Sequence, residues 1–473
     1  MVQFNNLPTQ RARDALHGTK QGSFWLANDP GEVFGDRLSE DTAADLLVIG
    51  AGFTGLWTAI LAKQAEPNRD VVLVDGGAVA WAASGRNGGF VSASITHGFA
   101  NGMARWPEEM PTLLRLGHEN LDAIESFVRE HHIECDFIRP GELSVAVAEH
   151  QIEELVSMTT AAQALGEHER FLDQAQTLAR IDSPTYLAAA LDEDGVALVD
   201  PVRLARGMAR VARELGVRIY EHTPIRRLHK SGRNVVAASD QATIIAQKVI
   251  LATNAFPPLL RRIKAYIVPV YDYVLVTEPL SDAQWSRIGW GGREGVADVG
   301  NRFHYYRTTQ DGRILWGGYD AMYHFGGKFS SKYDHHAESY LRLAEHFLQT
   351  FPQLEGIRFT HQWGGAIDTC SRFTAYWGTA MQGLVAYVVG FTGLGVGASR
   401  FGAATVLDLV DGRDTERTRL EMVRSKPIPF PPEPLRQAGI SITTASLAKA
   451  DEGDGSRNLW LRTLDRVGMG FDS

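Results

Sequence analysis

The chain is poor in cysteine and in long apolar runs. Its two cysteines, Cys135 and Cys370, form neither a CxxC pair nor a zinc-ligand spacing, so we expect no disulfide framework and no metal site. The longest apolar segment, residues 386–397, contains four glycines, and no stretch reaches the ~18 apolar residues of a membrane span. The polar N-terminus lacks the apolar run of a signal peptide. These absences predict a cytoplasmic protein whose thiols stay reduced.

Positive charge is also scarce. Lys and Arg number 47 against 56 Asp and Glu, which gives a net charge of −9. A nucleic-acid binder needs a basic face that releases counterions from phosphates, so this balance argues against that class of protein. The 473 residues exceed what one hydrophobic core usually serves, and we expect two consecutive or intertwined domains.

A glycine turn lies between a short apolar run, residues 46–49, and a helical stretch at 54–64. The turn is Gly50-Ala51-Gly52-Phe53-Thr54-Gly55, and the next apolar strand, residues 71–74, ends at Asp75. Strand, tight turn, helix and strand form a βαβ unit. In that setting the glycines let backbone approach a pyrophosphate at a helix N-terminus, and Asp75 can accept hydrogen bonds from a ribose. The motif predicts a bound dinucleotide but does not separate NAD from FAD. The alternative is an incidental glycine turn.

A second glycine-dense loop follows Asp75 after only eight residues. It reads Ala83-Ser84-Gly85-Arg86-Asn87-Gly88-Gly89, which is too close to Asp75 for another βαβ helix. Backbone rich in glycine can meet a flat ring at close range, so we expect this loop beside the dinucleotide. The alternative is a flexible surface loop.

A third glycine-rich turn joins a buried strand to a helix near the end of the chain. It reads Gly390-Phe391-Thr392-Gly393-Leu394-Gly395-Val396-Gly397-Ala398. The N–H groups and dipole of that helix would stabilise negative charge on a reduced flavin. The alternative is a close-packed helix start, which glycine also permits.

Together these motifs resemble the FAD enzymes of the D-amino-acid oxidase superfamily, and within it the gamma-glutamylputrescine oxidase group. The resemblance spans about residues 22–415 and includes Phe303-His304-Tyr305-Tyr306-Arg307, residues 312–318, residues 351–354 and Trp363-Gly364-Gly365. It implies an α/β fold of mixed type: a discontinuous Rossmann-like FAD-binding domain with a substrate domain built on a mixed or antiparallel sheet. It also implies FAD held without a covalent bond, with further contacts from Gly76, Ile225, Thr253 and Asn254.

The same resemblance predicts the division of the chain. Residues 43–115, 190–262 and 376–415 would form the FAD-binding domain, and residues 116–189 and 263–375 the substrate domain. Residues 1–42 would form an N-terminal arm, and residues 416–473 a C-terminal extension.

The chain departs from the relatives near the flavin. They often read Tyr-Ser-Gly-His-Gly-Val where this chain has Phe391 to Val396, so a tyrosine and a histidine are missing. This difference bears on the substrate and on the reaction with oxygen. Cys370 lies in the region where sarcosine oxidases attach flavin through a cysteine, but Asp368 takes the matching place. A cysteine is more often a small buried hydrophobe.

The aromatic middle of the chain, residues 263–375, is expected to build the substrate pocket. The candidates for catalysis are His304, Tyr305, Tyr306 and Trp363, with His97 as a possible acid or base. Aromatic walls hold a cationic amine, and a dry pocket favours its neutral form. Each of these residues, taken singly, is also an ordinary core residue. Arg372 can grip a substrate carboxylate or neutralise Asp368.

The leading hypothesis is an FAD-dependent oxidase of a small amine or amino acid, with oxygen as electron acceptor. The first alternative is a dehydrogenase of D-amino acids or glycine derivatives that uses another acceptor and needs an arginine for the carboxylate. A flavin monooxygenase is disfavoured because the late turn lacks the Asp of its Gly-Asp pair. The last alternative is a flavoprotein without catalysis.

Overall fold

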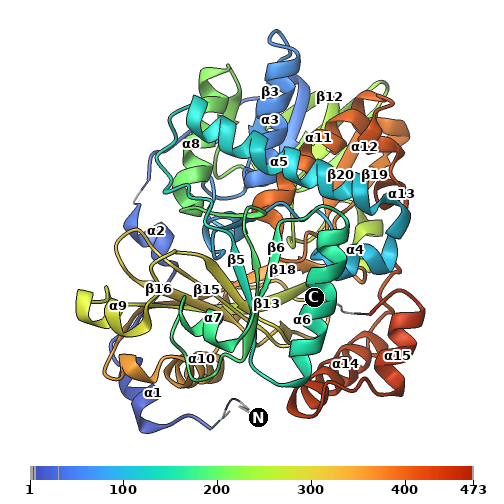
Figure 1. Ribbon diagram of the computed structural model, residues 1–473. Helices are drawn as coiled ribbons and strands as arrows, with labels where there is room; N and C mark the ends of the chain where they lie inside the picture. Colours follow the sequence, from blue (N-terminus) through green and yellow to red (C-terminus); the bar gives the residue numbers. More distant parts are fainter. Residues whose placement is uncertain (1–3, 5–6, 30, 471–473) are drawn as a thin grey trace.

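The computed structural model describes residues 4, 7–29 and 31–470 and shows two layers, each built on a sheet (Figure 1). The predicted arm and extension therefore include residues 1–3, 5–6, 30 and 471–473 that lie outside the described part. No helix within the described ranges is long and apolar enough to cross a membrane.

The first sheet carries the predicted βαβ unit. Its strands run in the order β10 (Arg227–Ser231), β11 (Asn234–Ala238), β12 (Thr243–Leu251), β2 (Thr42–Ile49), β3 (Val71–Val74) and β9 (Arg218–Tyr220), and β20 (Val385–Val389) pairs with β12 and with β19 (Tyr376–Ala380). Strands β20, β12, β2, β3 and β9 are parallel neighbours. Their continuous apolar sequences fit a sheet covered on both faces.

The second sheet is mostly antiparallel, as its aromatic and β-branched sequences predict. Its order is β1 (Lys20–Gln21), β18 (Phe359–Thr369), β13 (Val268–Thr277), β16 (Ile314–Gly318), β15 (His304–Thr308), β14 (Gly295–Asp298), β5 (Glu142–Ala146), β7 (Ala188–Asp192) and β6 (Glu169–Leu172), and β17 (Met322–Tyr323) pairs with β13. Strands β4 (Phe90–Ser92) and β8 (Val196–Leu198) pair with each other as a small antiparallel ribbon. Along the chain, each of them lies between a strand of the first sheet and a strand of the second.

Helices cover both sheets. In the first layer they are α3 (Phe53–Ala65), α4 (Phe99–Arg105), α5 (Met110–Glu130), α8 (Pro201–Glu214), α11 (Gly395–Asp411), α12 (Glu416–Arg419) and α13 (Glu421–Arg424). The others are α1 (Gln10–Ala15), α2 (Phe24–Asn28), α6 (His150–Ala164), α7 (Gln174–Leu178), α9 (Asp282–Ile288), α10 (Ala337–Thr350), α14 (Leu435–Glu452) and α15 (Leu459–Arg466). Helix α5 packs against α11, and its buried residues join the core of the first layer.

Local sequence explains several helix ends. Asp200 accepts hydrogen bonds from the N–H groups of Val202 and Arg203, and Pro201 is the first residue of α8. Helix α6 ends at Ala164. The chain turns at Gly166, where φ is +92°, and continues as β6 and α7 because strand β6 completes the edge of the second sheet beside β7.

Candidate functional site

The glycine turns found in the sequence meet at one edge of the first sheet. Strands β20, β12, β2 and β3 are parallel, so their carboxyl ends share this edge, where ligands of open α/β sheets bind. The opening turn (residues 50–55) follows β2, Asp75 and Gly76 follow β3, Thr253 and Asn254 follow β12, and the late turn (residues 390–395) follows β20.

The opening turn needs glycine for two physical reasons. Gly50 has φ of +112°, and a Cβ on it would lie 2.3 Å from the Ala252 carbonyl oxygen. A Cβ on Gly55 would lie 1.7 Å from the Gly50 carbonyl oxygen, so only glycine lets α3 start this close to the strand. The turn therefore presents the N-terminus of α3, including Phe53 and Thr54, at the edge of the sheet.

Asp75 braces the loops on either side of it. One carboxylate oxygen accepts from Ala51 N–H at 2.7 Å, and the other accepts from Gly77 N–H and the Trp81 indole, both at 2.8 Å. Burial raises the pKa of Asp75, and these hydrogen bonds oppose that rise. Each carboxylate oxygen can accept more than one hydrogen bond, so the position remains suited to a ribose hydroxyl.

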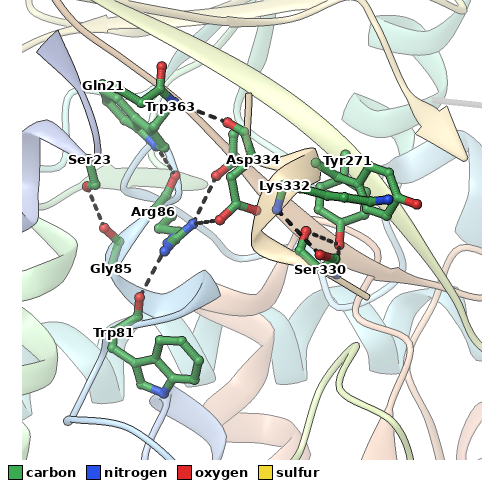
Figure 2. A network of polar contacts seen from close by, with 12 residues as sticks. Gln21, Ser23, Trp81, Gly85, Arg86, Tyr271, Ser330, Lys332, Asp334 and Trp363 are labelled. Carbon is green, nitrogen blue, oxygen red and sulfur yellow. Dashed lines mark hydrogen bonds and ion pairs between the residues drawn. The ribbon is translucent and has the colours of Figure 1, made fainter. Parts of the chain in front are cut away.

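The loop of residues 83–89, called here the Arg86 loop, is tied to distant parts of the chain (Figure 2). Its carbonyl oxygens at Gly85, Arg86 and Asn87 each accept a side-chain hydrogen bond. The donors are the Ser23 hydroxyl at 2.7 Å, the Trp363 indole at 2.8 Å and the Trp25 indole at 2.9 Å, in that order. The loop is therefore fixed by the N-terminal arm and by β18, and a flexible surface loop is excluded.

Side chains of the Arg86 loop also connect it to its surroundings. The Ser84 hydroxyl accepts from Phe53 N–H at 3.0 Å and so joins this loop to the opening turn. Arg86 makes an ion pair with Asp334 at 2.5 Å and donates to the Gly364 carbonyl at 3.3 Å (Figure 2). The Asn87 amide donates to the Ala83 and Ser84 carbonyls and accepts from Gly89 N–H, which holds the loop in one shape.

The late turn opens α11 toward the same region. Gly390 and Gly393 have φ of +86° and +97°, and a Cβ on Gly393 would meet nothing within 4 Å among the described residues. The buried Asp368 carboxylate accepts from Gly390 N–H at 2.6 Å, and burial raises its pKa to about 7. A Cβ on Gly397 would lie 2.2 Å from the Ser92 carbonyl oxygen, so α11 starts directly beside the strand that leaves the Arg86 loop.

The remaining residues predicted for the cofactor lie along the same edge. Leu394, Gly395 and Val396 form the start of α11, and Gly88 and Gly89 end the Arg86 loop. Gly76 lines a cavity of about 170 Å³ together with Thr223 and Pro224, next to Ile225 in the chain. Asn254 has φ of +47°, and its side chain accepts from Ala255 N–H.

This arrangement fits FAD. Two helix N-termini, α3 and α11, face one edge of the sheet. Neither N-cap residue, Gly52 or Leu394, makes a side-chain capping bond, and the Ser84 hydroxyl accepts from the first N–H of α3. A helix N-terminus is suited to a pyrophosphate, and a second one is suited to the negative charge of a reduced flavin. The Arg86 loop lies next to both turns, and the space beside Gly393 is open. The residues that would hold FAD are therefore those of the two turns, the Arg86 loop and Asp75.

The second sheet separates the catalytic candidates by face. Tyr305 contacts Gly88, and Trp363 donates to the Arg86 loop, so both lie on the face toward the glycine turns. His304 and Tyr306 alternate with Tyr305 along β15 and point to the other face. His304 is fully buried there, bonded to Asp298 at 2.6 Å and to His346 at 2.9 Å, and the Tyr306 hydroxyl bonds to that of Tyr186. The structure does not bring His304 and Tyr306 to the cofactor side.

Three further residues singled out in the sequence have protein partners. Burial, and then Arg105, lowers the pKa of His97 to about 4, and its ring stacks beside Phe373. The Arg372 guanidinium donates to the carbonyl groups of Thr374, Ala375 and Ser425. The Cys370 thiol is buried against the Gly390 backbone and the Thr374 carbonyl. Burial raises the pKa of this thiol and so keeps it protonated.

The sequence reasoning missed four residues of this region: Ser23, Trp25, Asp272 and Asp334. The arm residues Ser23 and Trp25 lie 62 positions before the carbonyl groups that they bind, and no local pattern links them. The only feature of the sequence that pointed to them is the presence of a tryptophan, Trp25, in an otherwise polar arm. Asp272 interrupts the apolar alternation of β13 on a face that is otherwise apolar, and that interruption was visible in the sequence.

Comparisons with known proteins give relatives that cover most of this chain. Residues 45–409 match the model of the family described as FAD dependent oxidoreductase. The chain is 29% identical over 393 residues to gamma-glutamylputrescine oxidoreductase of Escherichia coli, covering 81% of this chain and 87% of that protein. It is 28% identical over 389 residues to the probable oxidoreductase OrdL of Haemophilus influenzae, covering 80% and 85%. The crystal structure of glycine oxidase from Geobacillus kaustophilus matches with a TM-score of 0.67 at 19% identity, covering 79% of this chain and 96% of that one, and so shares the fold.

Proposed function

The chain belongs to the FAD dependent oxidoreductase family, and from that premise we propose that it oxidises the C–N bond of a small amine. The observation that carries the proposal is the arrangement at one sheet edge. The opening turn is bonded to the Arg86 loop, the helix of the late turn packs on the strand that follows this loop, and Tyr305 and Trp363 face it. When bound, FAD would take a hydride from the carbon beside nitrogen and pass two electrons to oxygen as hydrogen peroxide, while water hydrolyses the imine to a carbonyl compound and an amine or ammonia.

The protein's own groups prepare this reaction. The N–H groups of the opening turn and the Ser84 hydroxyl would bind the pyrophosphate, and Asp75 the ribose. The start of α11 would stabilise negative charge on the ring system without reorganisation. Tyr305 and Trp363 are packed into an apolar layer with Trp25 and Val274, which excludes water and favours the neutral amine.

The second candidate, a dehydrogenase of amino acids, has less support. Such an enzyme needs a guanidinium group for the substrate carboxylate. Arg86 is paired with Asp334, and Arg372 donates to backbone carbonyls. An amine without a carboxylate therefore fits these side chains better than an amino acid.

The test is anaerobic mixing of the FAD-loaded protein with a panel of amines and amino acids while the flavin absorbance is followed. We expect amines to bleach the flavin, and air to restore it with release of peroxide. Bleaching only by amino acids, with slow recovery in air, would favour the dehydrogenase. An absence of bleaching by every compound would refute the proposal.

A further inference from the structure

Asp272 lies on the face of the second sheet that holds the Arg86 loop. Its neighbours along β13 on that face, Val274 and Val276, pack with Trp363 in the apolar layer described above. Directly across on β18 stands Gly365, which has no side chain to cover the carboxylate. A Cβ on Gly365 would lie 3.7 Å from the Arg86 side chain, an ordinary packing distance, so the Arg86 loop covers β18 beside Asp272.

Tyr305 connects Asp272 to the Arg86 loop. Its hydroxyl donates to the Asp272 carboxylate at 2.7 Å. Its ring lies between two glycines, because a Cβ on Gly88 or Gly317 would come within 2.9 Å or 2.7 Å of it. The side chain of Tyr305 therefore contacts both the Asp272 carboxylate and the loop that lies beside the cofactor site.

Asp272 differs from the other carboxylates of this region in having no cationic partner within the described residues. Asp334 is paired with Arg86, and Asp320 with Arg342. Burial raises the pKa of Asp272 to about 6, and the Tyr305 hydroxyl opposes that rise. The carboxylate is therefore mostly ionised at neutral pH, and a buried anion of this kind is stabilised by a cation that binds beside it.

The guanidinium groups around the site are occupied. Arg86 pairs with Asp334, Arg307 donates to the Val199 carbonyl at 2.7 Å, and Arg372 donates to backbone carbonyls. The site thus offers an uncompensated negative charge and no free guanidinium among these three arginines. A substrate with a carboxylate would be repelled, and one with a second positive charge would be attracted.

We propose that Asp272 binds a second, non-reacting ammonium group of the substrate, so that the enzyme prefers diamines or longer polyamines without a carboxylate. This inference rests on the proposed amine oxidation. The reacting nitrogen must be neutral before its carbon can lose a hydride, whereas the distant nitrogen remains protonated on Asp272. One carboxylate thereby selects the substrate and leaves the reacting end uncharged.

The test compares three amines of equal length on the FAD-loaded protein under anaerobic conditions: butane-1,4-diamine, 4-aminobutan-1-ol and 4-aminobutanoate. The measured quantities are the dissociation constant and the limiting rate of flavin reduction. We expect the diamine to bind about 10- to 100-fold more tightly than the amino alcohol, as a charge-assisted hydrogen bond predicts, and the carboxylate to bind most weakly.

Two variants locate the effect. Asp272→Asn removes the charge and should bring the ratio between diamine and amino alcohol close to one. Tyr305→Phe removes the hydroxyl but keeps the carboxylate, so it should retain the preference for the diamine. If Asp272 only held Tyr305 in place, the two variants would behave alike, and that result would overturn the inference.

The wild-type comparison remains decisive even if Asp272→Asn fails to fold. Equal binding of the diamine and the amino alcohol by the wild-type protein would overturn the role of Asp272 while leaving amine oxidation intact. If none of the three compounds nor any amine of the wider panel bleached the flavin, the proposed function itself would fail, and the two failures are thus distinguishable.

Discussion

Three consecutive carbonyl groups, at residues 85–87, each accept a hydrogen bond from a side chain that is distant in the sequence. Ser23 and Trp25 come from the arm and Trp363 from β18. A loop must be held within a fraction of an ångström to place backbone beside a flat ring, and bonds from two separate elements achieve this. The positioning of the Arg86 loop is thus a property of single side chains outside it.

Replacing Trp25 by Phe tests this dependence. A benzene ring remains, but the pyrrole ring and its 2.9 Å hydrogen bond to the Asn87 carbonyl are lost, so the free energy that holds the loop in its binding shape falls by about 1 kcal/mol. We expect the dissociation constant for FAD to rise about fivefold, measured by adding FAD to the apoprotein and following flavin fluorescence.

The control is Trp316→Phe. Trp316 is fully buried in the other core of the second sheet, and its indole nitrogen has no partner in the described part of the chain. This variant should leave FAD affinity unchanged. If both variants weakened FAD binding equally, the carbonyl contact of Trp25 would not be the cause.

At the scale of elements, sequence patterns identified the strands and helices that form the cofactor edge. The apolar runs at residues 46–49, 71–74 and 387–389 lie in β2, β3 and β20. A short, continuous apolar run next to a turn is typical of a strand that is buried on both faces. Helix α14 was missed, since its mostly exposed residues carry almost no apolar period. The face on which His304 or Tyr305 points depends on strand register, which a single sequence does not determine.

Three neighbouring strands place carboxylates side by side. Glu142 on β5 and Glu169 on β6 both lie opposite Asp192 on β7. Burial, followed by repulsion from Asp192, raises the pKa of Glu142 to about 8 and that of Glu169 to about 7. Like charges directly opposite each other destabilise a sheet, so this end of the second sheet is more stable while protons remain bound than after they are lost.

The variant Glu142→Gln should reveal this pH dependence. The folded-state pKa of Glu142 lies above its ordinary value of 4.5, so the folded protein keeps a proton that the unfolded chain loses. Wild-type stability should therefore fall as the pH rises from about 4.5 to about 8, and the variant should be about 2 kcal/mol more stable above pH 8.

Urea unfolding at pH 5 and pH 9 measures this difference, with Glu154→Gln on the exposed side of α6 as the control. The control should match the wild type at both values. A constant difference between Glu142→Gln and the wild type across this range would contradict the account.

At the scale of the whole molecule, the C-terminal extension joins the two layers. Arg372 and Ser371 bind the backbone at Ser425 and Ile428, while Glu433 accepts from the Tyr323 hydroxyl. Helix α14 continues beside the second sheet, next to α15 (Figure 1). Nothing local in the sequence revealed these contacts, because each joins residues more than 50 positions apart.

The far end of α14 is held by Asp451, and Asp451→Ala should release it. Asp451 accepts from the N–H groups of Asn301 and Arg302, both at 3.0 Å, and from the Asn301 amide. We expect amide hydrogen exchange in α14 to accelerate about tenfold, measured by mass spectrometry. The exposed Asp454, whose side chain accepts only from Ser456 among the described residues, provides the control Asp454→Ala. Equal exchange in both variants would show that Asp451 does not anchor the helix.

The central claim is that this chain holds FAD at the edge formed by its two glycine turns and uses it to oxidise an amine. An anaerobic titration of the FAD-loaded protein with butane-1,4-diamine tests it most directly, with flavin absorbance and carbonyl product measured together. We predict complete bleaching with one carbonyl product formed per flavin. A flavin that stays oxidised with this diamine and with every other amine tested, although it is firmly bound, would contradict the account.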